Sequence, residues 1–229
     1  MTMITEVTAP EECVEYVNQA GFCLWTRRRG WESWPSLEAV TPWVESADTN
    51  GEKIDSFASP FMMQTWFWKD DLYIEKKLYY GQILGAGVAA LVSLEMLPYL
   101  IASQGDNDAR TLYEKNRLPH LSLQVYEHIE KNGVTASNKL PVGFKDRYKS
   151  LIPLQQRFLL TKHSLTGRTR GKYGYNWGLC EEHFPDAFQA AAKLPVEKAR
   201  ETIRTHLSET QGISLTDTQA ARIFHWNPL

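Results

Sequence analysis

The sequence lacks the cysteine pattern of a disulfide scaffold or a metal site. Its 229 residues include only three cysteines, Cys13, Cys23 and Cys180, which are widely spaced and form no Cys/His cluster with metal-ligand spacing. We interpret them as reduced thiols of a cytoplasmic protein, and we predict neither a metal nor a cofactor. The N-terminus carries acidic residues where a secretory signal needs a basic start and an apolar run, so we expect no such signal.

Short motifs that identify a reaction are also missing. We find no P-loop, no GxGxxG, no GxSxG elbow and no HExxH pair, and the six histidines show no paired ligand spacing. These absences leave the chain without a sequence signature for a nucleotide-dependent enzyme, a serine hydrolase or a zinc protease.

The sequence has no long uninterrupted apolar run. The segment Leu84–Ala102 has the length of a membrane span, but Glu95 and Pro98 interrupt it. A carboxylate at mid-span costs about 2.5–3.5 kcal/mol on insertion scales. We therefore predict a buried strand followed by a helix that is kinked or divided near Pro98, and no membrane partner.

The composition that remains is that of an ordinary soluble protein with many tryptophans. It is 43% hydrophobic and 23% charged, with a net charge of −2 and eight Trp. This balance argues against indiscriminate coating of nucleic acid, but it allows a local basic patch. The length is that of one large or two small domains.

Several residues mark the ends of predicted helices. Thr8 and Glu11 form a capping-box pattern for an opening helix, and Gly21 ends it. Thr216 and Gln219 form the same pattern before the last helix. A polar stretch at 45–55 indicates an exposed excursion between elements.

The order of the predicted elements divides the chain after residue 108. Residues 1–108 alternate helices with short apolar strands and are rich in aromatics. Residues 109–229 begin as helix, short helix, longer helix and hairpin, and end in tail helices. We therefore predict an α+β fold, mainly helical, with an N-terminal aromatic-rich α/β subdomain and a C-terminal winged helix-turn-helix.

A basic window without acids lies in the predicted winged helix. Between Arg147 and Cys180 the chain has seven Lys or Arg and no Asp or Glu. A solvated surface usually mixes both signs, so we predict that the third helix and the wing contact DNA. The alternative is a basic surface without a partner, or one that docks on acidic parts of the same molecule. The predicted DNA contacts are Lys145, Arg147, Lys149, Arg157, Lys162, Arg168, Arg170 and Lys172.

Two features refine that prediction. If the wing tip continues as a strand, Arg168, Arg170 and Lys172 point to one side. A second basic cluster, Arg27, Arg28 and Arg29, lies in a predicted loop beside Trp31, where it could hold a phosphate backbone without reading its sequence. We add these three arginines to the predicted DNA contacts.

Six of the eight tryptophans fall between residues 25 and 68. Such a cluster is most often a core or a domain interface. The functional alternative is a pocket in which an extruded or single-stranded base stacks, with Asp70 or Glu95 orienting water as a general base. The predicted pocket residues are Trp66, Trp68, Lys69, Tyr79 and Tyr80.

The stretches FCLW, PSLEAV, WFWKDDL and VSLEMLPYL, followed by PLQQRFLLTK and YGYNWGLCEEHFPDAF, resemble the AlkZ-related proteins of bacteria over about residues 20–190. Better-known relatives of that group are winged-helix DNA glycosylases that act on crosslinks and alkylated purines. The resemblance implies duplex DNA as the partner and base excision as the chemistry. Those enzymes carry a Gln-x-Asp or Gln-x-Gln motif for the catalytic water, and Gln64, Gln124, Gln155 and Gln156 do not have that spacing.

The sequence therefore predicts a DNA-binding winged-helix protein related to the DNA glycosylases of base-excision and crosslink repair. Two alternatives stay open. One is a non-enzymatic winged-helix regulator or damage sensor. The other is a winged helix that mediates protein contacts only. The sequence specifies neither the lesion nor the oligomeric state.

Overall fold

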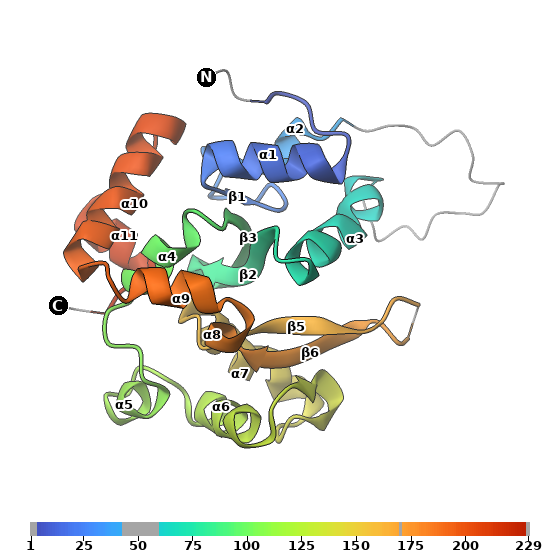
Figure 1. Ribbon diagram of the computed structural model, residues 1–229, viewed down its shortest axis with the longest axis vertical. Helices are drawn as coiled ribbons and strands as arrows, with labels where there is room; N and C mark the ends of the chain where they lie inside the picture. The colour runs from blue at the N-terminus through green and yellow to red at the C-terminus, as the bar shows by residue number, and fades with distance from the viewer. Residues whose placement is uncertain (1–3, 43–59, 170, 228–229) are drawn as a thin grey trace.

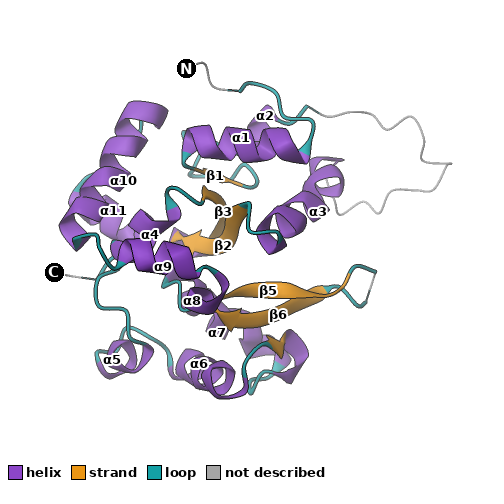
Figure 2. Ribbon diagram, in the orientation of Figure 1, coloured by secondary structure: helices purple, strands orange, loops and turns teal. Residues whose placement is uncertain are grey.

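A computed structural model describes residues 4–42, 60–169 and 171–227, with the side chains of 60–64 also left undescribed. Over this part of the chain it contains eleven α-helices and two three-stranded antiparallel sheets (Figures 1 and 2). The predicted mixed, mainly helical fold is confirmed at this level. Trp43 and the predicted excursion at 45–55 lie outside the described residues.

The first sheet has the strand order β1-β3-β2. Helices α1, α2 and α3 precede or flank it, the 3-10 turn η1 joins β2 to β3, and α4 follows (Figure 1). The elements are α1 (Pro10–Ala20), β1 (Phe22–Leu24), α2 (Leu37–Val40), α3 (Pro60–Ile74), β2 (Leu78–Leu84), η1 (Gly85–Gly87), β3 (Val88–Ser93) and α4 (Leu97–Ala102).

The second sheet has the order β4-β6-β5 and belongs to the middle of the chain. Its long hairpin, β5 and β6, extends below α3 in Figure 1, and α3 contacts β5. The elements are α5 (Ala109–Glu114), α6 (His120–Asn132), β4 (Thr135–Ala136), η2 (Ser137–Lys139), α7 (Phe144–Gln156), β5 (Leu160–Gly167) and β6 (Gly174–Leu179).

The tail returns to the first sheet. His206 and Gln211 both hydrogen-bond the carbonyl of Ala20, and Gln104 donates to the carbonyl of Phe224 at 2.9 Å. The tail therefore completes the core of the N-terminal part. Its helices are α8 (Cys180–His183), α9 (Pro185–Ala191), α10 (Val196–Gln211) and α11 (Asp217–Phe224).

Two hydrophobic cores result. One joins the first sheet to α1, α4 and the tail, and includes Leu24, Leu91 and Leu207. The other lies between α5, α6, α7 and the second sheet, and includes Val125, Leu154 and Trp177. The predicted division at residues 108/109 stays a prediction.

The predictions at the helix ends have mixed outcomes. The α11 capping box is confirmed, because the Thr216 hydroxyl accepts from the Gln219 N–H at 3.3 Å and Gln219 Oε1 accepts from the Thr216 N–H at 2.9 Å. At α1 the predicted box is wrong by one residue. Pro10 occupies the first helical position, which suits its fixed φ, so Glu12 rather than Glu11 accepts from the N–H groups of Thr8 and Ala9.

The segment Leu84–Ala102 is confirmed as strand plus helix, in β3 and α4. The kink expected near Pro98 is wrong, because Pro98 stands in the first turn of α4, where its missing N–H costs nothing. Within the described residues, every helix is too short or too polar to cross a bilayer.

Candidate functional site

The candidate site is built around Asp70, a carboxylate that α3 carries into the interior. Asp70 is 2% exposed and the neighbouring Lys69 is 3% exposed. Their side chains form an ion pair with 3.0 Å between Lys69 Nζ and Asp70 Oδ1. A buried charge is stable only when it is paired and hydrogen-bonded, so the rest of the site has to supply partners.

Two tyrosines of the β5–β6 hairpin supply them. Tyr173 donates to Asp70 Oδ2 at 2.6 Å, and Tyr175 donates to Asp70 Oδ1 at 2.8 Å. Alternate residues of an extended strand point to one face, so both rings reach α3 together. Burial raises the pKa of both phenols, with the nearby Asp70 adding to the effect, and keeps them as neutral donors. The carboxylate has three donors from two separate parts of the chain.

Aromatic rings surround the Lys69 ammonium. Its Nζ lies 4.3 Å from the ring centroid of Trp66, 5.2 Å from Trp25 and 5.4 Å from Tyr80. Burial lowers the pKa of Lys69, and the Asp70 charge opposes that shift. Because ring faces attract a cation, the three rings and the Asp70 carboxylate together favour the charged form of the Lys69 ammonium.

A second buried amine, Lys162 of β5, lies against the same group of aromatic side chains. Lys162 is 7% exposed, and its Nζ lies 3.7 Å from the centroid of Tyr80 and 4.7 Å from that of Tyr175. Burial lowers the pKa of Lys162 well below its usual value, repulsion from Lys69 adds to the shift, and Asp70 opposes it. Together these side chains form the Asp70 cluster, with one carboxylate, two amines and five aromatic rings. Its members are Asp70, Lys69, Lys162, Trp25, Trp66, Tyr80, Tyr173 and Tyr175.

Strand β2, which carries Tyr80, contacts α7, and this helix has an exposed face. Phe144 is 83% exposed and Tyr148 is 58% exposed, and the exposed Lys145 and Lys149 lie beside them on the same helix. Burial raises the pKa of Tyr80, and the nearby Asp70 adds to the effect. Gln82, two residues after Tyr80 in β2, donates to the Tyr148 hydroxyl at 2.5 Å, so Tyr148 lies beside the strand that carries Tyr80. Arg147 is half-buried, with its guanidinium 5.4 Å from the Phe144 ring.

The hairpin tip lies against α3. Arg168 is exposed and pairs with Asp71, with 3.2 Å between Nη1 and Oδ2, and its guanidinium also lies over the Phe67 ring. Arg168 and the exposed Lys172 follow the end of β5 and precede β6. The prediction that they alternate along a strand is therefore wrong, because the pairing of β5 with β6 ends at Gly167–Gly174. Arg170 lies outside the described residues.

Of the other predicted DNA contacts, some are exposed and some are engaged inside the fold. Arg27, Arg28 and Arg29 are exposed in the loop between β1 and α2. Arg157 is half-buried and donates to Asn227 Oδ1 at 2.7 Å, and burial lowers its pKa to about 10. Arg157 ties α7 to the C-terminus, and Lys162 lies inside the cluster. Neither side chain is placed to reach a phosphate on the surface.

Of the five predicted pocket residues, three lie in the Asp70 cluster and two pack elsewhere in the hydrophobic core. Trp66, Lys69 and Tyr80 join Asp70 in the cluster. Tyr79 is fully buried against Tyr73, Phe158 and Phe184, and Trp68 packs on the first core. Glu95, the second carboxylate predicted as catalytic, is exposed between β3 and α4.

Sequence reasoning missed Tyr173 and Tyr175 and assigned Lys162 to the surface. The alternating YGY in the stretch KYGYNW was the available signal, because two aromatics on one face of a strand require something to pack against. Which element they pack against depends on how the hairpin docks on α3.

One Gln-x-Asp spacing does occur, at Gln104-Gly105-Asp106. Gln104 is buried and its amide donates to the Phe224 carbonyl, while Asp106 pairs with Lys115 at the surface. Both groups are engaged in the fold, and neither touches the Asp70 cluster.

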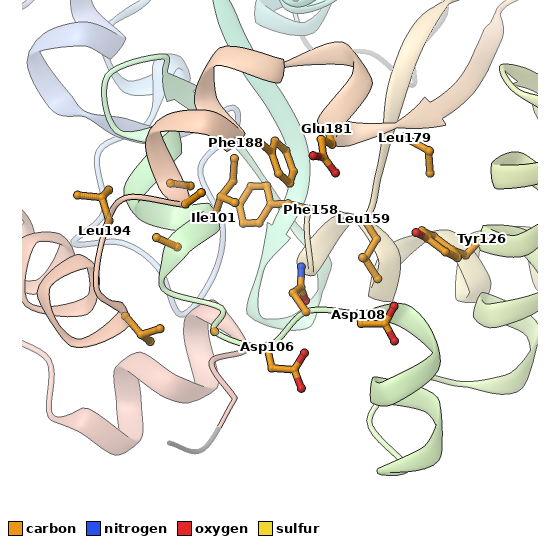
Figure 3. A pocket seen from close by; sticks show the side chains of 16 residues that line it. Ile101, Asp106, Asp108, Tyr126, Phe158, Leu159, Leu179, Glu181, Phe188 and Leu194 are labelled. Carbon is orange, nitrogen blue, oxygen red and sulfur yellow. The ribbon is translucent and has the colours of Figure 1, made fainter.

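Asp106 borders a different cavity of about 580 Å³, shown in Figure 3. Its wall includes the rings of Phe158 and Phe188, and Asp108 and Glu181 add two more carboxylates. Three acids would repel a phosphate backbone. No group of three or more His, Cys, Asp or Glu that could hold a metal ion occurs within residues 4–42, 60–169 and 171–227.

A family model described as AlkZ related matches residues 7–225. No curated protein and no solved structure matches the chain.

Proposed function

The chain belongs to the AlkZ-related family, and we propose that it binds duplex DNA through a winged helix and removes a damaged base at Asp70. The family is consistent with a role in DNA repair. The observation that carries the proposal is the place of Asp70: a buried carboxylate of α3 is bonded by two tyrosines of the β5–β6 hairpin, the hairpin that follows α7 in the chain.

The order of elements supports a winged helix in residues 109–179. Helix α6, strand β4, turn η2, helix α7 and the β5–β6 hairpin follow one another, and β6 lies between β4 and β5. In winged helices of this order the last helix before the hairpin enters the DNA major groove, and the hairpin contacts the flanking backbone. The corresponding elements here are α7 and the β5–β6 hairpin.

The exposed charges support a DNA surface over these two elements. The surface consists of Lys145, Lys149, Arg168 and Lys172, with Arg27, Arg28 and Arg29 as a second group. Phe144 and Tyr148 stand among the lysines of α7, where aromatic faces are available to stack on exposed bases.

The Asp70 cluster supports base excision. Cleavage of a glycosidic bond passes through a cation-like sugar, which a nearby carboxylate stabilises or supplies with an oriented water. Trp66, Tyr80 and Tyr175 provide flat faces for an extruded base. Asp70 would act here without help from a Gln-x-Asp pair, because Gln104 is bonded to Phe224 and Asp106 to Lys115.

The second candidate function is a DNA-binding module without chemistry, such as a damage sensor. The observation in its favour is that three donors already satisfy the Asp70 carboxylate. A carboxylate held in this way also serves as a tie between α3 and the hairpin.

Duplex binding at several salt concentrations tests the DNA surface. Each neutralised phosphate contributes about −0.9 to the slope of log affinity against log salt, so Lys145→Ala with Lys149→Ala should flatten the slope by up to about 1.8. The matched control is Lys193→Ala with Lys198→Ala, two exposed lysines of the tail. A wild-type slope near zero would contradict phosphate contact.

Base release from alkylated duplex under single-turnover conditions tests the chemistry. We expect Asp70→Asn to lower the rate by about 100-fold, as expected for loss of a positioned general base, with duplex binding retained. Asp186→Asn, an exposed carboxylate on α9, is the control. Unchanged release in Asp70→Asn removes Asp70 from the reaction, and a wild type that binds DNA but releases no base favours the second candidate.

A further inference from the structure

The Asp70 cluster holds one more amine than its carboxylate can neutralise. Lys69 is paired with Asp70 and also donates to Tyr173 at 3.1 Å and Tyr175 at 3.3 Å. For Lys162, the described residues provide two ring faces, and no hydrogen bond or ion pair to its Nζ is found among them. The two lysines are therefore chemically different.

The surroundings of Lys162 favour the uncharged amine. The residue is only 7% exposed with its Nζ against two rings, and the nearby Lys69 is a cation already bound to the single carboxylate. Burial and Lys69 both lower the pKa of Lys162. A lysine that is desolvated and lies next to another cationic group is the usual form of an amine nucleophile that attacks carbonyl carbons.

An aldehyde is the substrate class that such an amine takes. On the proposed function, removal of a base leaves an abasic deoxyribose, whose ring-opened form has an aldehyde at C1′. We propose that Lys162 forms an imine with this aldehyde, and that the protein cleaves the DNA strand at abasic sites as a lyase. This inference rests on the proposed function, because it requires the sugar to reach the same cluster.

The chemistry balances without an oxidant or a reductant. The lone pair of Lys162 Nζ forms a bond to C1′ while the carbonyl oxygen takes a proton, and loss of water gives the iminium. A base then removes the C2′ proton, the electron pair forms a C2′=C3′ double bond, and the C3′–O bond breaks to release the phosphate. Water hydrolyses the imine and returns the free amine.

The neighbours of Lys162 fit these steps. Tyr175 joins Asp70 to Lys162, because its hydroxyl donates to Asp70 Oδ1 at 2.8 Å and its ring centroid lies 4.7 Å from Lys162 Nζ. Asp70 is therefore the carboxylate that would take up the C2′ proton. Lys69 keeps a positive charge beside the amine and disfavours its protonation. Tyr173 and Tyr175 are only half-buried, so the cluster reaches solvent along these two side chains. The sugar would enter there by displacing the Tyr175 ring from Lys162.

Borohydride trapping on an abasic duplex tests the inference with the full-length protein. The hydride reduces the imine to a stable amine, so we expect a covalent protein–DNA adduct, and peptide mass mapping of the wild type should place it on Lys162. Lys162→Met should lose trapping by about 100-fold or more, as expected for removal of a nucleophile. Lys193→Met, at an exposed lysine, is the matched control.

The outcomes separate this inference from the proposed function. Duplex binding and near-ultraviolet circular dichroism are measured on each variant, so loss of trapping in a folded, DNA-binding Lys162→Met protein supports the role. An adduct on Lys69 or on a surface lysine overturns it, as does absence of an adduct in wild type that binds the abasic duplex. If wild type binds no duplex, the proposed function has failed, and 2-deoxyribose 5-phosphate with borohydride then tests the amine alone. Failure of that sugar to label Lys162 ahead of exposed lysines overturns the inference.

Discussion

At the scale of single residues, the cost of burying Lys162 has a measurable consequence for stability. Its pKa is lowered in the folded state, so the unfolded chain binds more protons, and the free energy of unfolding rises with pH between the lowered pKa and the usual value of about 10.4. The free-energy cost of burying Lys162 is thus largest at low pH. This direction is opposite to that of a lysine stabilised by an ion pair.

We therefore expect Lys162→Met to be more stable than wild type by about 1 kcal/mol or more at neutral pH, since folding takes the Lys162 amine out of water and favours loss of its proton, and an apolar chain of similar length carries no such cost. The difference in free energy of unfolding between Lys162→Met and wild type should become smaller as pH rises towards 10. Urea unfolding of both proteins at pH 6 to 9.5 measures it, and a difference that is constant with pH would contradict the assignment.

The residue scale also shows what the sequence could predict about the site. Trp66, Lys69, Asp70 and Tyr80 were predicted together because they are close in sequence. Lys162 was predicted at the surface because lysines usually are exposed. Its burial results from the docking of β5 against α3, a contact between segments about ninety residues apart that no local pattern encodes.

At the scale of elements, local chemistry specifies helix ends well when the capping groups are side chains. In α11 the Thr216 hydroxyl and the Gln219 carboxamide satisfy two backbone N–H groups, and both were readable in the sequence. The hairpin tip was harder, because charge alternation resembled a strand where the chain forms a loop.

The α11 cap predicts a local stability effect. We expect Thr216→Ala to lower the free energy of unfolding by about 1 kcal/mol, because it leaves an N–H of the first turn without its acceptor. Thr218→Ala, an exposed position in the same turn, should be neutral or slightly stabilising because alanine favours helix. Chemical denaturation of the two variants checks this, and equal destabilisation would show that the cap contributes nothing.

At the scale of the whole molecule, the two ends of the chain share one core. Residues of α1, the first sheet and α4 pack with α10 and α11, whereas α5 to β6 enclose the second core. A division by sequence position assigns α10 and α11 to the second unit, because the apolar face of an amphipathic helix gives no sign of which distant sheet it will cover. We propose that the tail 180–227 belongs to the N-terminal unit.

Hydrogen exchange can distinguish the two divisions. In the full chain the amides of α10 should be protected, since Ile203 and Leu207 lie fully buried in the first core. In a fragment of residues 109–229 that core is missing, so we expect α10 and α11 to exchange about as fast as an unfolded chain, while α6, α7 and the β5–β6 hairpin keep part of their protection.

Protection of α10 in the fragment equal to that in the full chain would contradict the shared core and restore the division at 108/109. Loss of protection throughout the fragment would show that the second core also depends on the first, through the contacts of α7 with β2 and of β5 with α3.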